Sequence, residues 1–490
     1  MFHTMKVIIG LMILGGLSAF PTLIHAQSDP LLRHAMVRVN PVTDYEAFKP
    51  SPLPDRINLT WNDDPATTQA VSWRTDAGVE RAFAQIAIST EGPLFWHSTQ
   101  WAKTQSLVTN LGKAHYHTVT FRDLEPDTEY IYRVGDGMNW SEWFHFRTAS
   151  NEEQPFSFVY FGDIQEDIRS QSSRVIRRAF RDASDARFFI YGGDLVDNAH
   201  NDGEWGEWFE AHGFISASVP LVPSPGNHEH DSGSLSDQWR LQFALPKNGP
   251  EDLMETTYYF DYQNARIISL NSAVHVSRGR RGHGFEAEYI QPLQTEWLEE
   301  VLKNNPSKWT IVVFHHPVFS PVIGRDEFEI REQWKPLFDK YQVDLVLTAH
   351  DHSYSRTNAE SRVYPFKTHF GDTGQDYFDP NSGTVYVNSH AGSKTMRMDR
   401  ADWMARAGED LQMYQIIQID GDTLYYEAKT ANGLLYDAFL MTRRDGAPNE
   451  IIDKIPEDVD EILRGEDSIL PDRLRPWFYH ERRFVDPPRR

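Results

Sequence analysis

The strongest constraint on the fold is a series of five short polar motifs, most of which lie at or just after an apolar run. They are, in chain order, Gly162-Asp163-Ile164-Gln165, Gly193-Asp194-Leu195-Val196-Asp197, Gly226-Asn227-His228-Glu229, Val312-Val313-Phe314-His315 and Ala349-His350-Asp351-His352. The first follows Phe156–Phe161, a run typical of a buried strand. Open α/β folds place their sites at the carboxyl ends of sheet strands. We therefore expect an α/β domain in which the motif residues meet at strand ends.

The motifs supply carboxylate, amide and imidazole groups in the numbers that two metal ions need. Two-metal hydrolases hold their ions about 3.5–4 Å apart and keep some coordination positions open. The chain has no Cys, which excludes thiolate sites, and the remaining ligand types suit zinc, iron, manganese and nickel. One Gly-Asp pair is usually only a turn, whereas five such motifs in order indicate a two-metal site.

The region before the first motif has the pattern of a β-sandwich. Residues 27–54 are rich in proline and read as an extended lead-in. Residues 55–148 contain short runs that alternate apolar and polar residues, such as Ala70–Arg74 and Glu129–Val134. Leu124–Tyr130 resembles the tyrosine-corner turn of fibronectin type III domains, and a generic hairpin containing a tyrosine is the alternative. We expect a fibronectin type III-like β-sandwich here.

Residues 155–443 mix strands with helices. Trp309–Phe314 and Asp344–Thr348 read as buried strands, and Gln294–Leu302 carries apolar residues at helical spacing. Strands that alternate with helices predict a layered α/β core. Residues 444–490 are charged and contain proline, and we expect them to form a tail on the surface.

The N-terminus has the features of a signal peptide over residues 1–26. Lys6 precedes the apolar run Val7–Leu14, which is too short to span a membrane comfortably, and Ile24–Ala26 offers a cleavage site. An uncleaved N-terminal anchor is the alternative. We expect a secreted or periplasmic protein with no transmembrane segment after cleavage.

The formal charge of -23 argues against stable binding of nucleic-acid phosphates. It does not exclude chemistry on a small phosphate compound, because metal ions override the global field locally. Arg278–Arg281 is the most concentrated basic patch within residues 155–443. It is either a solvated loop or a lip that steers anions. The oligomeric state is left open.

The ordered motifs resemble those of the calcineurin-like metallophosphoesterase superfamily. With the domain that precedes them, they are similar to its purple acid phosphatase branch, over residues 55 to 443. The resemblance implies a multidomain fold: an N-terminal fibronectin type III-like β-sandwich, then an α/β four-layer β-sandwich metallophosphoesterase domain. It implies an enzyme, which we expect to be exported because of its N-terminus, that hydrolyses a small phosphate ester or nucleotide by attack of a metal-bridging hydroxide. The implied cofactor is two divalent or mixed-valence metal ions, of iron, manganese or zinc.

The resemblance also implies a role for each motif residue. The implied ligands are Asp163 and His352 for the first metal, Asp194 for both, and Asn227, His315 and His350 for the second. His228 would steady the phosphoryl group or protonate the leaving oxygen, a contribution of typically ~10²–10⁴-fold. His316, next in sequence to His315, is the open alternative for that ligand.

Two positions depart from the purple acid phosphatase pattern. Gln165 stands where that branch has glycine and where many other superfamily members have a ligating histidine, so its amide oxygen is a predicted metal ligand. Asp197 stands where the branch has a ligating tyrosine, and we expect it to orient a ligand instead. Without the tyrosinate the protein should not be purple, and manganese or a mixed iron–manganese or iron–zinc pair is favoured.

Two other functions are compatible with the sequence. Gln165 favours a nucleotide phosphodiesterase or pyrophosphatase, because it departs from the acid-phosphatase pattern. The other alternative is a surface-binding protein with an inactive metal domain. It is disfavoured because every proposed ligand position holds a residue that can bind a metal.

Overall fold

A computed structural model describes residues 45–463, except 232–233, 275–286, 323–324, 326, 358–362, 369–370, 378–382 and 445. The predicted signal peptide, most of the lead-in, the Arg278–Arg281 patch and the end of the tail lie outside the described residues. The short helices are η1 (Glu46–Phe48), η2 (Ile168–Ser172), η3 (Gly213–Ile215), η4 (Glu251–Leu253) and η5 (Ser272–Val274).

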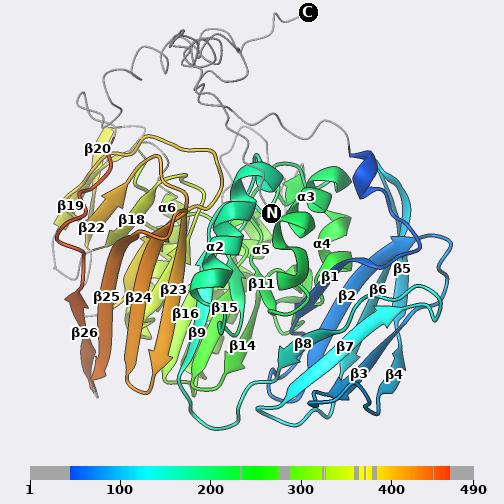
Figure 1. Cartoon of the computed structure of the whole chain (residues 1–490). Coiled ribbons are helices and arrows are strands. Elements are labelled where there is room, and N and C mark those ends of the chain that lie inside the picture. Colours follow the sequence, from blue (N-terminus) through cyan, green and yellow to red (C-terminus); the bar gives the residue numbers. More distant parts are fainter. Residues whose placement is uncertain are drawn as a thin grey trace, which may run out of the picture. The chain divides into compact units, whose positions relative to one another are not determined.

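The N-terminal domain consists of two four-stranded antiparallel sheets (Figure 1). The first has the order β1 (Asp55–Thr60), β2 (Gln69–Asp76), β6 (Gly112–Phe121), β5 (Lys103–Thr109). The second has the order β4 (Ser98–Trp101), β3 (Phe83–Ile88), β7 (Glu129–Gly135), β8 (Phe144–Arg147). Trp73 of the first sheet and Tyr132 of the second lie in the same apolar core. The predicted β-rich domain is thus confirmed.

One turn of this domain has the contact expected of a tyrosine corner. The backbone N–H of Glu125 donates to the hydroxyl oxygen of Tyr130 at 2.8 Å. A tyrosine corner joins such a hydroxyl to a backbone group a few residues upstream. The contact supports the interpretation of Leu124–Tyr130, while the assignment to fibronectin type III stays a prediction.

The second domain is built on two seven-stranded sheets. The first has the order β11 (Leu221–Pro223), β10 (Phe189–Tyr191), β9 (Phe156–Phe161), β23 (Met413–Asp420), β24 (Thr423–Thr430), β25 (Leu435–Arg444), β26 (Ala447–Asp453). The second has the order β14 (Tyr258–Tyr262), β15 (Ala265–Ser269), β16 (Trp309–Val313), β17 (Leu345–Thr348), β21 (Val385–Asn388), β18 (Tyr354–Thr357), β22 (Met404–Gly408). Two hairpins, β12 (His230–Asp231) with β13 (Ser234–Leu235) and β19 (Val363–Thr368) with β20 (Gly371–Tyr377), complete it.

Alternation along β16 shows how the layers form. Ile311 and Val313 lie in the core shared with the first sheet, whereas Val312 lies in a separate core with Trp334. Successive strand residues face opposite sides of a sheet, so a strand that is apolar throughout is covered on both faces. The second core contains residues of α5 (Ala287–Lys303) and α6 (Phe328–Lys340). The first sheet is covered by α2 (Ser173–Asp182) and α3 (Asp202–His212) (Figure 1). The next helix along the chain is α4 (Asp237–Gln242). The predicted four-layer domain is confirmed.

The motif loops follow parallel strands. In the first sheet β10 pairs in parallel with β9 and β11, and Tyr191 is in register with Phe161 and Pro223. In the second sheet β15, β16, β17 and β21 are parallel, and Val313 is in register with Leu347. Because the strands end in register, the loops after them start at the same edge of each sheet.

The start of the predicted tail differs from expectation. Ala447–Asp453 forms β26, which pairs antiparallel with β25 at the edge of the first sheet. Its side chains are exposed or half-buried, so it lacks the apolar alternation by which a strand is recognised. Backbone hydrogen bonds to an open sheet edge are sufficient to order such a segment.

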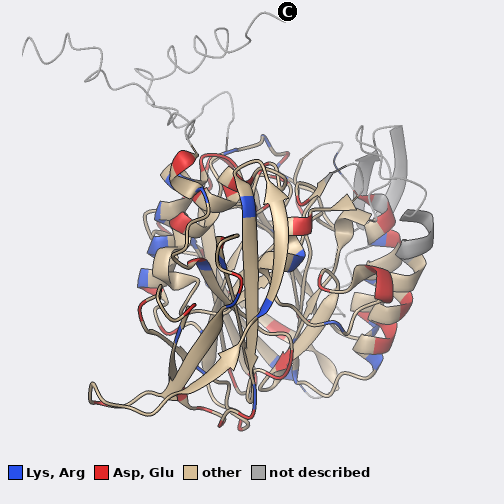
Figure 2. Cartoon of the chain, turned by 90° about the vertical axis from the view of Figure 1, so that its right-hand side faces the viewer, with Lys and Arg blue, Asp and Glu red and all other residues tan. Residues whose placement is uncertain are grey.

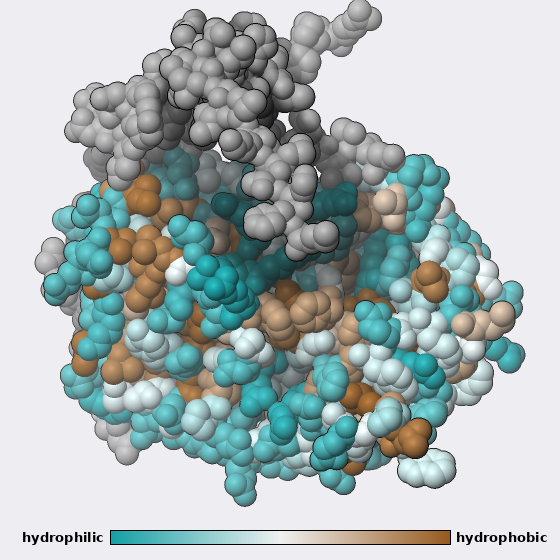
Figure 3. Space-filling model, in the orientation of Figure 1, coloured by the Kyte–Doolittle hydropathy of each residue, from teal (hydrophilic) through white to brown (hydrophobic). Residues whose placement is uncertain are grey.

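Charged residues occur on strands as well as on helices and loops (Figure 2). Several of these are buried in ion pairs, such as Arg356 with Asp437. Large apolar side chains remain exposed in loops of the N-terminal domain, with Trp96 at 98% and Met138 at 90%. On the face shown in Figure 3, apolar side chains lie scattered among polar ones. Such a mixture is ordinary for a protein surface. No helix in the described part of the chain is both long enough and apolar enough to cross a membrane.

Candidate metal centre

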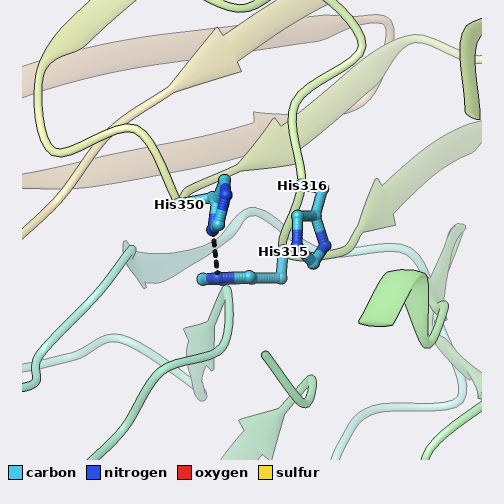
Figure 4. Close-up of side chains that lie close together, drawn as sticks. All are labelled: His315, His316 and His350. Carbon is cyan, nitrogen blue, oxygen red and sulfur yellow. Dashed lines mark hydrogen bonds between the residues drawn. The ribbon is translucent and has the colours of Figure 1, made fainter. Parts of the chain in front are cut away.

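Four predicted ligands, each from a different motif loop, lie close together around one nitrogen atom, His315 Nε2. It lies 3.1 Å from Asn227 Oδ1, 3.1 Å from Asp194 Oδ2 and 3.0 Å from His350 Nδ1. Figure 4 shows the rings of His315 and His350 joined by this last contact. Donor atoms from both sheets therefore converge on one point, at the spacing that ligands of a single ion have.

The backbone fixes which nitrogen of two imidazoles is free. His315 Nδ1 lies 3.0 Å from the Gly192 carbonyl, and His352 Nδ1 lies 3.1 Å from the Lys394 carbonyl. A carbonyl only accepts, so each Nδ1 carries a hydrogen, and in the neutral imidazole each Nε2 keeps a lone pair. Metal-binding histidines are usually oriented in this way by a backbone or carboxylate acceptor. Both Nε2 atoms are thus available to a metal.

Asp163 has one oxygen in use and one without a partner. Its Oδ2 accepts the backbone N–H of His350 at 2.7 Å. Its Oδ1 is buried, has no hydrogen-bond partner among the described residues, and lies 3.9 Å from His352 Nε2. Buried polar atoms without partners are rare and call for a bound ion or water. Asp163 Oδ1 and His352 Nε2 thus fit the place of the first metal, apart from the ion expected at His315.

Gln165 lies beside these two groups. Its Nε2 is 3.2 Å from His352 Nε2, and its Oε1 is buried without a hydrogen-bond partner among the described residues. The two ends of an amide are nearly the same shape, and turning the group by half a revolution exchanges them. A turned amide would aim Oε1 at the region of His352 Nε2, as the predicted ligand role requires.

The two buried carboxylates repel one another electrostatically. Burial raises the pKa of Asp163 to about 8, and the charge of Asp194 adds to the effect. Burial opposes the charge on Asp194 too, but His315 and His228 outweigh it and hold the pKa of Asp194 below its usual range. In the described part of the chain, neither carboxylate has an ion pair with Lys or Arg. The nitrogen and oxygen donors, beside two carboxylates whose ion-pair partners among the described residues are histidines alone, fit a pair of metal cations.

His228 lies at the open side of the centre. Its Nδ1 donates to the Asp197 carbonyl at 2.6 Å, its Nε2 lies 3.8 Å from Asp194 Oδ2, and its side chain is 20% exposed. Burial lowers the pKa of His228, but the charges of Asp194 and Asp197 outweigh it, so the pKa is raised overall. Asp197 was expected to orient a metal ligand, and in the structure it orients His228 instead.

His316 packs beside the two histidines in Figure 4 without sharing their contact. Its ring centre is 4.2 Å from that of His350, and its Nδ1 is 2.9 Å from Ser272 Oγ. One nitrogen atom of each of His315, His316 and His350 lies within 4.8 Å of the others. The alternative in which His316 supplies a ligand therefore stays open.

The sequence interpretation gave no role to Glu229, the last residue of the third motif. Its carboxylate is buried and accepts hydrogen bonds from three backbone N–H groups of the motif loops. The sequence did hold one indication of a role: Glu229 is an acidic residue directly after the proposed site residues Asn227 and His228, in the loop that follows β11.

Comparison with known proteins matches both domains to family models. Residues 54–148 match the purple acid phosphatase N-terminal domain, and residues 156–354 match the calcineurin-like phosphoesterase domain. The chain is 27% identical over 375 residues to acid phosphatase type 7 of Mus musculus, which covers 71% of this chain and 80% of the relative. It is 24% identical over 351 residues to Fe(3+)-Zn(2+) purple acid phosphatase 12 of Arabidopsis thaliana, covering 65% and 69%.

A solved structure agrees with the fold. Purple acid phosphatase PPD1 from yellow lupin (Lupinus luteus) seeds superposes with a TM-score of 0.61 at 18% sequence identity, over 80% of this chain and 75% of that chain. At this identity the likeness concerns the fold alone.

Proposed function

The chain belongs to the purple acid phosphatase-like branch of the calcineurin-like metallophosphoesterases, and on that basis we propose that it hydrolyses small phosphate monoesters. It is a metal-dependent phosphoesterase that uses two ions drawn from iron, manganese and zinc. The relatives named acid phosphatase support monoesters as the substrate class.

The observation that carries this proposal is the convergence at His315 Nε2 of an amide oxygen, a carboxylate oxygen and a second imidazole. Each contact is 3.0–3.1 Å long, and the groups come from separate loops. The residues that would hold the pair are Asp163 and His352 on one side, Asn227, His315 and His350 on the other, and Asp194 between them. When bound, two such ions supply Lewis acidity for the phosphoryl oxygens and lower the pKa of water toward about 7.

His228 is the residue proposed to act on the substrate. Because its Nδ1 hydrogen is held by the Asp197 carbonyl at 2.6 Å, its Nε2 side is directed toward Asp194, and the side chain is 20% exposed. A protonated imidazole there can donate to a phosphoryl oxygen and pass its proton to the leaving-group oxygen. The carboxylate of Asp197, with Oδ1 3.4 Å from His228 Nδ1, stabilises the protonated form.

Asp197 also sets a spectroscopic expectation. A carboxylate replaces the phenol that would bind iron at this position, so the iron-loaded protein should lack a tyrosinate charge-transfer band. The visible absorption spectrum of purified protein measures this directly. An intense purple band would mean that another tyrosine reaches the centre.

A second candidate function, hydrolysis of nucleotide diesters or pyrophosphates, is favoured by Gln165. Its amide, 3.2 Å from His352 Nε2, places a polar side chain beside the first metal position, where the acid-phosphatase pattern has glycine. Comparing a phosphomonoester with its bis-ester under the same conditions separates the two functions. Turnover of the bis-ester that exceeds turnover of the monoester would favour the second.

We also propose that the protein is exported, on the strength of the N-terminal Lys6 and the apolar run Val7–Leu14. Cell fractionation of the full-length protein, with and without residues 1–26, tests this. Retention of the full-length protein in the cytoplasm would contradict it.

The main test joins metal analysis to turnover. Purified protein should contain two metal ions per chain and should hydrolyse para-nitrophenyl phosphate. A fully metallated protein that is inactive on this ester, on its bis-ester and on nucleotide esters would sink the enzyme proposal.

A further inference from the structure

Glu229 joins two of the motif loops through their backbones. Its Oε2 accepts the N–H of Asp194 at 2.9 Å and the N–H of Gly226 at 2.7 Å, and its Oε1 accepts the N–H of Leu195 at 2.8 Å. The carboxylate is fully buried. The second and third motifs are therefore tied together by one side chain, whose hydrogen bonds go to backbone N–H groups and not to the side chains of the proposed metal ligands.

The backbone that Glu229 holds is in an unfavourable conformation. Asp194 has φ +51°, the left-handed region that non-glycine residues rarely occupy. Such conformations persist only where surrounding contacts determine them, and they gather at functional sites. Two of the three Glu229 hydrogen bonds go to the N–H groups of Asp194 and Leu195, on either side of the strained φ and ψ angles.

The same two loops approach one another without room for another side chain. A Cβ atom on Gly226 would lie 2.2 Å from Asp194 Oδ1 and 2.5 Å from Asp194 N. A Cβ atom on Gly193 would lie 2.6 Å from Gly226 N and 2.8 Å from His315 Nδ1. The distance between Asp194 and Asn227 thus depends on how closely these backbones are held.

We propose that Glu229 is a positioning residue for the metal centre: its carboxylate clasps the second and third motif loops so that Asp194 and Asn227 reach the same ion. The inference rests on the two-metal site proposed above. It assigns to Glu229 no contact with metal or substrate, only the geometry of the residues that make those contacts.

The clasp requires two acceptor oxygens and the length of the glutamate side chain. A carboxylate has only acceptor oxygens, so it satisfies three converging N–H groups. A glutamine would turn an NH₂ group toward at least one N–H, and an aspartate is one methylene too short to reach both loops. Residues that orient ligands in this way change metal affinity by ~10–100-fold when mutated.

The test measures the affinity of the metal-depleted full-length protein for Zn²⁺ by competition with a chelator. We expect Glu229→Gln and Glu229→Asp each to weaken Zn²⁺ binding by ~10–100-fold. Glu207→Gln is the matched control, because Glu207 is a buried carboxylate that accepts the backbone N–H of Arg169 in η2 and not an N–H of the second or third motif loop. We expect that control to bind as the wild type does.

Each outcome bears on the clasp. Wild-type Zn²⁺ affinity in either Glu229 variant would overturn the clasp. If the wild-type chain takes up neither Zn²⁺ nor iron nor manganese, both the clasp and the proposed function are overturned. If the wild type binds metal and the Glu229 variants bind it with the same affinity, only the clasp is overturned.

A measurement on the wild type covers the case in which the variants do not fold. Hydrogen exchange resolved to single residues should show the amides of Asp194, Leu195 and Gly226 exchanging as slowly as the amide of Ile190 within β10. Exchange at the rate of exposed loops would overturn the clasp.

Discussion

Two buried clusters of acidic residues in this molecule are neutralised in different ways. Asp202, at the start of α3, accepts from Arg56 of β1 at 2.7 Å and from Arg74 of β2 at 2.6 Å. Burial raises the pKa of Asp202, but the two arginines outweigh it and lower the pKa overall. Asp163 and Asp194 of the metal centre are equally buried, and among the described residues they have only histidines as ion-pair partners.

The difference indicates what each cluster is for. A buried charge is tolerated when it is paired and hydrogen-bonded, and the chain supplies both partners around Asp202. At the metal centre the chain supplies atoms that can bind a metal instead, namely Asp163 Oδ1, His315 Nε2 and His352 Nε2. At the metal centre the positive charge is that of the metal ions. The Asp202 cluster therefore joins two domains, whereas the cluster of Asp163 and Asp194 binds cofactors.

The largest effect is expected from Asp194→Asn. The substitution keeps the shape but removes the charge proposed to lie between both ions. We expect activity to be abolished and metal loading to be disrupted, measured by turnover of para-nitrophenyl phosphate and by elemental analysis of the same sample. Retained turnover would refute the assignment of Asp194 as the bridge.

The second largest effect should come from Asp202→Ala, which breaks the internally neutralised cluster. It leaves Arg56 and Arg74 buried without their shared partner, and breaking a buried pair costs about 3–5 kcal/mol. Chemical denaturation should therefore show a loss of unfolding free energy of that order. The matched control is Asp63→Ala, whose exposed ion pair with Arg122 is worth about 0–1 kcal/mol. Equal losses in the two variants would contradict the account.

A buried group that has no ion pair among the described residues, His117, extends the comparison. His117 of β6 lies between Thr75 Oγ1 at 2.8 Å and Thr104 Oγ1 at 2.9 Å. Burial lowers its pKa from 6.5 to about 4, with a smaller contribution from His115. Since the folded pKa lies below the unfolded value, the stability is present above pH 6.5 and is lost as the pH falls toward 4. The loss should approach ~3 kcal/mol, because one pKa unit corresponds to ~1.4 kcal/mol.

His117→Gln isolates this contribution from those of other titrating groups. Urea unfolding of both proteins at several pH values between 7 and 4 should show a steeper loss of stability for the wild type. Parallel curves would mean that His117 does not titrate differently on unfolding.

The smallest effect is expected from His316→Gln. Its Nδ1 is held by Ser272 and its ring packs on His350, so loss of the imidazole should leave both ions bound. We expect Zn²⁺ affinity to change less than ~10-fold, against a loss of one ion in His315→Gln. The reverse order, measured by elemental analysis and chelator competition, would assign the ligand to His316.

The parts of the molecule that were predictable from sequence are those encoded by local patterns. Apolar runs such as Phe156–Phe161 and Trp309–Phe314 predicted buried strands, and the motif order predicted which loops meet. The exposed strands β4 and β5 were not anticipated, because all of their side chains are exposed or half-buried and their order comes from pairing with β3 and β6.

Interactions between distant residues account for the rest. Arg56 and Arg74 lie 146 and 128 positions from Asp202 in sequence, and no local spacing reveals that the three meet. The role of Asp197 depends on where the His228 ring turns, and the role of Glu229 depends on backbone N–H groups that every residue except proline has. Such contacts follow from the fold and not from residue type.

Anomalous X-ray diffraction from crystals of the metal-loaded protein tests the two-metal assignment most directly. The account predicts two peaks about 3.5–4 Å apart, one beside Asp163 and His352 and one beside Asn227, His315 and His350, with Asp194 between them. A single peak among His315, His316 and His350, or a loaded protein with no peak near Asp194, would contradict it.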